Sequence, residues 1–169
     1  VKQNMNDKYQ EFTAKNDVSW VDGFAEKLYM PQPNNEGVIE QFDGYMGLED
    51  ISISDLKKRI IKPNEYLGGG CGIATTTRVI KQADVIMMLN VFRNEYPKDV
   101  LAANWDFYEP YTEHGSSLSA CAYGIVAAII GRPDWAYKYF MKTATIDITG
   151  DSKQYVGDLY IGGTHPAAN

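Results

Sequence analysis

The sequence contains few residues that form disulfides or bind metals, with two cysteines and two histidines in 169 residues. Cys71 lies in a run of glycines and Cys121 lies in an apolar segment. This placement matches neither a disulfide framework nor the paired ligands of a zinc site. We therefore expect a reduced chain that binds no metal.

Basic residues and long apolar runs are also scarce. The net charge of -6 offers no basic surface to a phosphate backbone, so nucleic acid is not an expected partner. No stretch is apolar over the roughly 20 residues that cross a bilayer. Residues 1–10 lack the apolar core of a secretory signal peptide. We expect a cytoplasmic protein with no membrane contact.

The sequence does have the apolar residues for a core, which make up 44% of the chain. A first helix is predicted after Asp17, a suitable N-cap, because Trp20 and later apolar residues follow at helical spacing, and Pro31 ends it. We expect its apolar face to be buried. Residues 37–48 are rich in glycine and aromatics and predict an extended loop or short strand, with a turn at residues 43–44.

Three more helices are predicted further along the chain. Residues 75–92 have apolar side chains on nearly every face, which is typical of a helix buried on all sides. A second buried helix begins at Ser116 or Ser117 and stops at Gly131, and an amphipathic helix starts at Pro133. Since each inner helix needs an outer one to cover it, the alternation predicts an all-α fold of two concentric helical layers.

The first candidate site is the pair Lys81 and Gln82, a cation and an amide near the start of an apolar stretch. An ammonium group is costly to bury without a partner. Either the pair faces solvent or bonds Asp84, or its polar groups point into a cavity and hold neighbouring hydroxyls of a sugar. These residues alone leave both interpretations open.

The second candidate site is Ser116 and Ser117, which follow His114 and Gly115 at the start of a predicted helix. Hydroxyls and backbone N–H groups at a helix N-terminus form an anion site, although serines there are also common helix caps. The third candidate is His165, among small residues that allow a ligand to approach closely. A lone histidine is equally compatible with a structural role.

Aromatic and acidic residues give less specific signals. The aromatic side chains of residues 105–111 form either a sugar-stacking wall or packing between helices. Cleavage of a glycosidic bond needs a carboxylic acid at the leaving oxygen. Six carboxylates are available, and no local context singles out one of them: Glu40, Asp43, Asp50, Asp106, Glu109 and Glu113.

Five motifs, taken in order, resemble glycoside hydrolase family 65, the family of maltose, trehalose, kojibiose and nigerose phosphorylases. They are EQFDGY at residues 40–45, VIKQADV at 79–85, NWDFYEP at 104–110, HGSSLS at 114–119 and GTHPAA at 163–168. Together they extend over about three-quarters of the chain, which makes the resemblance specific.

The resemblance implies an (α/α)6 barrel and an inverting phosphorolysis of an α-glucoside to β-glucose 1-phosphate and a free acceptor. Inorganic phosphate is then the co-substrate, and no other cofactor is implied. The family's Lys-Gln pair, which holds the glucosyl unit, corresponds to Lys81 and Gln82. Its paired serines and later histidine, which bind phosphate, correspond to Ser116, Ser117 and His165.

The resemblance also implies that residues 1–169 are the later half of the barrel, within a single catalytic domain. The family's general acid is a glutamate in a Gly-Pro-Asp-Glu-Tyr type of motif, which this sequence lacks. We expect that acid, a β-sandwich and the first barrel helices to lie upstream, so no catalytic residue is assigned here and the chain alone is expected to be inactive. The family resemblance suggests a homodimer.

Two other functions stay open. A hydrolase of the same fold, such as a trehalase-like enzyme, would use a carboxylate to activate water instead of binding phosphate. A non-catalytic carbohydrate-binding helical domain would bind sugar through the same aromatics and Lys81–Gln82, with no dependence on phosphate.

Overall fold

The computed structural model describes residues 6–60, 72–114 and 117–145, and the chain divides into two compact units, Val1–Met30 and Pro31–Asn169. Cys71, Ser116 and His165 lie outside the described residues. Among the described residues there is no β-strand, and two isolated backbone bridges are the extended pairings. The predicted all-α class is confirmed.

The first unit contains the helices α1 (Asn6–Lys15) and α2 (Ser19–Lys27). The prediction of Asp17 as the N-cap was wrong by one residue: the N-cap of α2 is Val18, whose side chain makes no capping hydrogen bond. The carboxylate of Asp17 does accept a hydrogen bond from the backbone N–H of Ser19, the first residue of α2, at 3.0 Å. The prediction of a buried face was wrong within this unit, because Trp20 is 64% and Phe24 59% exposed. The described part of the unit holds only α1 and α2, so no third helix is there to cover that face.

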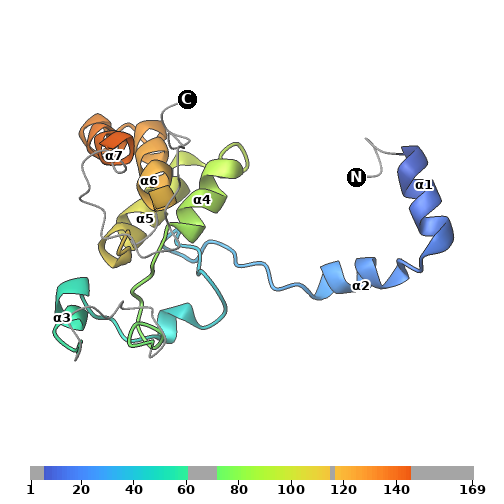
Figure 1. The fold of residues 1–169 in the computed structure, drawn as a ribbon, viewed down its shortest axis with the longest axis horizontal. Coiled ribbons are helices and arrows are strands. Elements are labelled where there is room, and N and C mark those ends of the chain that lie inside the picture. Colours follow the sequence, from blue (N-terminus) through green and yellow to red (C-terminus); the bar gives the residue numbers. More distant parts are fainter. Residues whose placement is uncertain (1–5, 61–71, 115–116, 146–169) are drawn as a thin grey trace. The chain divides into compact units, whose positions relative to one another are not determined.

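The second unit is organised around α6 (Ser117–Ile129). This helix contacts α4 (Asp84–Val91), α5 (Lys98–Tyr108) and α7 (Pro133–Thr145), and Figure 1 shows the four helices gathered together. Gly131 has a φ of 82°, a left-handed conformation that favours glycine after a helix. The predicted boundaries of the second buried helix and of the amphipathic helix at Pro133 are confirmed.

The core between these helices is rich in aromatic rings. Trp105 is 3% exposed and its ring lies 5.9 Å from that of Tyr123 and 5.2 Å from that of Trp135. Tyr108 is fully buried, and its hydroxyl donates to the carbonyl oxygen of Ile39 at 2.6 Å. Of the two interpretations of residues 105–111, the structure therefore supports packing between helices for these two rings.

The helix predicted over residues 75–92 was wrong in its first half. Helix α4 begins at Asp84, and the preceding residues run in turns and extended backbone. Two parallel bridges, Glu49 with Thr77 and Ile80 with Thr112, take the backbone hydrogen bonds that a helix would use. The β-branched residues of this segment suit an extended backbone. Lys81 and Gln82 consequently lie in a loop before the helix.

Residues 37–48 form a loop that ends in the short 3-10 helix η1 (Tyr45–Gly47). Gly44 has a φ of 86°, which confirms the turn predicted at residues 43–44. The fully buried Asn104 holds the start of the loop, because its Oδ1 accepts from the N–H of Ile39 at 2.8 Å and its Nδ2 donates to the carbonyl of Gly37 at 2.9 Å. Helix α5 thus fixes the loop that carries Gln41.

The sequence analysis did not predict three of the α-helices: α1, α3 (Ile53–Lys57) and α5. Helix α5 begins directly after Pro97. A short helix η2 (Glu109–Tyr111) extends α5 towards the loop before α6.

Candidate functional site

A cavity of about 430 Å³ lies within the second unit, between the loop before η1, the turn at residues 74–77 and the segment that leads into α4. Its wall combines apolar and polar groups: Gln41, Phe42, Tyr45, Leu48, Ala74, Thr75, Thr77, Val79, Ile80, Lys81, Gln82, Asp84 and Glu113. Rings and aliphatic groups with a few polar groups are typical of a small-molecule site.

The bridge between Ile80 and Thr112 brings two distant motifs to this cavity. The N–H of Ile80 donates to the carbonyl oxygen of Tyr111 at 2.9 Å, and the N–H of Glu113 donates to the carbonyl oxygen of Ile80 at 2.8 Å. Lys81 follows Ile80 and Glu113 follows Thr112, so the two residues come directly after the paired positions, and both line the cavity. The segment that leads into α6 starts at the same place.

A carboxylate and two amides form one side of the cavity. The Nε2 of Gln82 donates to Oδ1 of Asp84 at 2.9 Å, and the Nε2 of Gln41 donates to Oδ2 of the same carboxylate at 2.9 Å. The side-chain carbonyl oxygen of Gln41, Oε1, is buried and has no hydrogen-bond partner within the described structure.

The floor of the cavity is held by Tyr45 and Arg78. Tyr45 is 1% exposed, and its hydroxyl donates to the carbonyl oxygen of Arg78 at 2.5 Å. Burial raises the pKa of Tyr45, so this hydroxyl stays protonated and remains a donor. The guanidinium of Arg78 donates to the carbonyl oxygen of Met46 at 2.6 Å and pairs with Asp50. Asp50 also accepts from the hydroxyl of Tyr111 at 2.6 Å.

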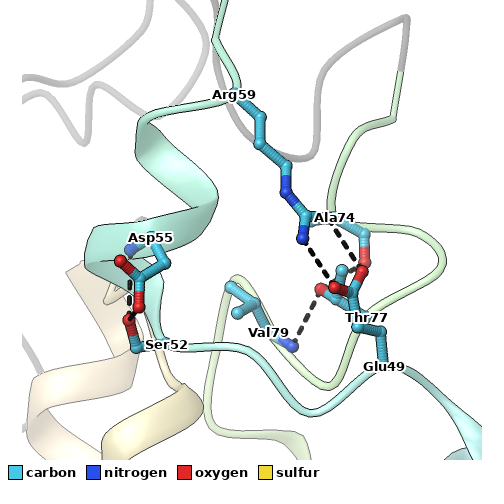
Figure 2. Close-up of polar contacts among 7 residues, drawn as sticks. All are labelled: Glu49, Ser52, Asp55, Arg59, Ala74, Thr77 and Val79. Carbon is cyan, nitrogen blue, oxygen red and sulfur yellow. Dashed lines mark hydrogen bonds and ion pairs between the residues drawn. The ribbon is translucent and has the colours of Figure 1, made fainter.

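The outer wall is fixed by polar contacts around α3 (Figure 2). Arg59 donates two hydrogen bonds to Glu49, at 2.8 and 2.6 Å, and these hold the pKa of Glu49 below its ordinary value. The hydroxyl of Thr77 donates to the carbonyl of Ala74 at 2.9 Å and accepts from the N–H of Val79 at 3.2 Å. These bonds shape the turn whose residues line the cavity.

His114, directly before the predicted phosphate loop, is held by a chain of hydrogen bonds. Its Nδ1 lies 3.0 Å from the hydroxyl of Ser119, and its Nε2 lies 3.0 Å from the hydroxyl of Tyr139, which donates to Glu109 at 2.8 Å. Burial, with Lys142 and Lys138 adding to it, lowers the pKa of His114 to about 3. The imidazole is thus neutral at pH 7.

The hydrogen bonds also define which nitrogen carries the proton. The hydroxyl of Tyr139 gives its one proton to Glu109 and must accept from Nε2–H of His114, so Nδ1 accepts from Ser119. His114 has a φ of 54°, which is uncommon for a residue with a side chain. Sequence reasoning named His114 as part of a motif and missed this network. Its conformation gave no sequence signal beyond the adjacent Gly115.

The structure describes some of the predicted site residues and not others. Lys81 and Gln82 are exposed and line the cavity. Ser117 begins α6, while Ser116 and His165 lie outside the described residues. The roles proposed for all five residues stay predictions.

Several of the six candidate carboxylates have well-defined structural partners. Asp106 pairs with Arg132 at 2.7 Å, Asp50 with Arg78 and Glu109 with Tyr139, and Glu40 accepts from backbone N–H groups of the loop before η1. Of the six, Glu113 is the one that lines the cavity.

In the part of the chain that the structure describes, no group of three histidine, cysteine or carboxylate side chains lies close enough to hold a metal ion. Nor does any helix there have the length and apolarity needed to span a membrane.

The sequence and the fold both match known proteins. A family model described as the glycosyl hydrolase family 65 central catalytic domain matches residues 2–166. A nigerose phosphorylase of Lachnoclostridium phytofermentans is 51% identical over 143 residues, which cover 84% of this chain and 19% of that relative. A 1,2-alpha-glucosylglycerol phosphorylase of Bacillus selenitireducens is 42% identical over 151 residues, covering 89% and 20%.

A solved structure agrees with these relatives. The protein, from the human microbiome and assigned as a kojibiose phosphorylase, superposes with a TM-score of 0.68 at 26% identity, covering 86% of this chain and 19% of its own. The chain thus spans about a fifth of the length of the curated relatives that it matches.

Proposed function

We propose that this chain, which belongs to glycosyl hydrolase family 65, is part of an enzyme that cleaves an α-glucosidic bond with inorganic phosphate. Its helices are part of an (α/α)6 barrel. The chain is the later part of that barrel, and the enzyme that contains it is called the parent enzyme below. Support comes from relatives that are named as phosphorylases of nigerose, kojibiose and 1,2-alpha-glucosylglycerol.

The observation that carries the proposal is the bridge between Ile80 and Thr112. It joins the loop of Lys81 and Gln82, which lines a cavity of about 430 Å³, to the segment that leads into α6 and its serines. A sugar-binding pair and an anion-binding helix start are the two subsites that a phosphorolysis needs next to each other.

In the proposed reaction, Lys81 and Gln82 hold the glucosyl unit, and Ser116, Ser117 and His165 hold phosphate. A general acid from outside this chain protonates the glycosidic oxygen. An oxygen of phosphate bonds to the anomeric carbon from the opposite face as the bond to the acceptor breaks. The products are β-glucose 1-phosphate and the acceptor. Phosphate is itself nucleophilic, so the step uses no second carboxylate as base.

We also infer the cellular location, oligomeric state and co-substrate of the parent enzyme. A charged glucose 1-phosphate is retained inside a cell, which fits a cytoplasmic enzyme. We infer a homodimer from the family resemblance and inorganic phosphate as the co-substrate, with no other cofactor. The β-sandwich and the first barrel helices are expected in the parent enzyme.

A hydrolase is the second candidate, because one observation favours it. Glu113 lines the cavity beside Lys81, where a carboxylate in reach of water would act as a base. The relatives named as phosphorylases weigh against this alternative.

Product analysis separates the candidates. The parent enzyme is incubated with nigerose, kojibiose, trehalose, maltose and 1,2-α-glucosylglycerol, with and without phosphate, and proton NMR identifies the sugar products. We expect β-glucose 1-phosphate from one or more of these substrates, only with phosphate, and loss of activity in Lys81→Ala and Ser117→Ala. Free glucose at the same rate without phosphate would identify a hydrolase. Sugar binding with no cleavage would indicate a binding domain.

A further inference from the structure

We propose that Asp84 is a positioning residue, which fixes the side-chain amides of Gln82 and Gln41 so that Gln82 presents a defined acceptor and donor to a sugar hydroxyl. The inference rests on the proposed function in one respect, that the cavity holds the glucosyl unit. It assigns a role to Asp84 and Gln41, which the motif comparison left without one.

The geometry imposes an orientation on both amides. An ionised carboxylate only accepts hydrogen bonds, whereas a glutamine amide has a donating nitrogen and an accepting oxygen. Each oxygen of Asp84 lies 2.9 Å from one amide nitrogen, Oδ1 from Gln82 and Oδ2 from Gln41. Turning either amide over would set its oxygen against the carboxylate, which is repulsive. The nitrogen end of each amide is therefore held at Asp84.

Gln41 shows that the carboxylate imposes this orientation. The side-chain carbonyl oxygen of Gln41 is buried, with no partner in the described part of the chain, an arrangement that costs free energy. Gln41 gains nothing for its own oxygen from this orientation. What it gains is the bond to Asp84, which ties the loop before η1 to the start of α4 across one side of the cavity.

A capping role for Asp84 does not account for these contacts. Asp84 is the first residue of α4, where a negative charge is favourable near the helix N-terminus. That effect needs only the charge. Neither glutamine belongs to α4, and Gln41 comes from a loop far away in the sequence. The two hydrogen bonds are best explained by a role of Asp84 in orienting the glutamine amides that line the cavity.

The oriented amide complements the neighbouring lysine. A lysine ammonium group only donates hydrogen bonds. With its nitrogen at Asp84, Gln82 keeps a carbonyl oxygen and one N–H for a ligand. Lys81 and Gln82 together then match one sugar hydroxyl that accepts and a neighbouring one that donates. Without Asp84, the Gln82 amide would populate both orientations and lose this match.

A mutant cycle in the parent enzyme tests the assignment. Asp84→Asn keeps the size of the side chain but adds a donor, so one amide must turn over. We expect the KM for the α-glucoside to rise about tenfold or more, with a smaller change in kcat. In a Gln82→Ala background the same substitution should change kcat/KM less than about twofold, because its target is gone. Gln41→Leu should raise the KM about threefold.

The matched control is Asp134→Asn, which removes the same charge from the first turn of α7, away from the cavity lining. Its kcat/KM should stay within about twofold of wild type. No effect of Asp84→Asn, or an equal effect with and without Gln82, would overturn the proposal. If the wild-type enzyme shows no phosphate-dependent cleavage, the proposed function has failed separately. The same cycle, read by calorimetry as affinity for glucose, then decides the role of Asp84.

Discussion

Ile80 and Thr112 are paired in a parallel backbone bridge, although they belong to motifs that are far apart in the sequence. The pairing sets Lys81 beside Glu113 in the cavity wall and places the segment before α6 at the same site.

Asn104 is predicted to be essential for the loop that carries Gln41. Asn104→Leu removes a fully buried amide and leaves the N–H of Ile39 and the carbonyl of Gly37 without partners. We expect the free energy of unfolding to fall by about 2–5 kcal/mol. Urea denaturation of the parent enzyme measures the change.

Asn90→Leu is the control for this prediction. The side-chain carbonyl oxygen of Asn90 lacks a partner within the described structure, so this substitution should lower the free energy of unfolding by less than about 1 kcal/mol. Equal losses would contradict the prediction.

Two glycines in helices should respond to alanine in opposite directions. A Cβ at Gly124 would lie 3.2 Å from the Cβ of Tyr139, so α6 and α7 must move apart, and Gly124→Ala should destabilise by about 1–2 kcal/mol despite the better helix former. A Cβ at Gly23 meets nothing within 4 Å, so Gly23→Ala should stabilise α2 by about 0.5–1 kcal/mol. Hydrogen exchange of peptides from α6 and α2 measures both. Stabilisation by both substitutions would disprove the close packing of α6 on α7.

His114 is predicted to make stability depend on acid. Its pKa is about 3 when folded, below the ordinary value of 6.5. Between pH 6.5 and about 3 the unfolded chain binds a proton that the folded chain does not. The free energy of unfolding therefore falls as pH falls through this window, by up to about 1.4 kcal/mol per pH unit, and His114 contributes no slope above it.

The control for this prediction is His114→Asn, because asparagine tolerates the left-handed conformation of His114. Urea denaturation of both proteins at pH 7, 6 and 5 gives the two slopes. The variant's slope should be flatter by about one proton. Parallel slopes would mean that the imidazole is protonated in the folded state.

Local patterns predicted the later helices well. A continuous apolar stretch between Ser117 and Gly131, and a proline at position 133, gave the boundaries of α6 and α7 because both ends carry strong signals of their own. Helix α5 was missed because its many aromatic residues suggested a ligand wall, whereas Trp105 and Tyr108 pack into the core.

Long-range contacts could not be predicted from these patterns. The segment at residues 77–82 is apolar enough for a helix, but its backbone hydrogen-bonds to Glu49, Tyr111 and Glu113. Nothing in the local sequence identifies those partners. The same limit applies to the site. Lys81 and Gln82 were named from their types, and a bond to Asp84, which Gln82 makes, was one of the two interpretations of the pair. The bond from Gln41 to Asp84 could not be predicted, because it depends on a loop placed by Asn104.

Separate titrations of the two substrates test most directly the claim that the chain carries adjoining sugar and phosphate subsites. Initial rates of the parent enzyme are measured with the α-glucoside varied at saturating phosphate, and with phosphate varied at saturating glucoside. We expect Lys81→Ala to raise the KM for the glucoside at least about tenfold and the KM for phosphate less than about twofold, and Ser117→Ala to do the reverse. An unchanged KM for phosphate in Ser117→Ala, or equal rises in both constants for both variants, would contradict the account.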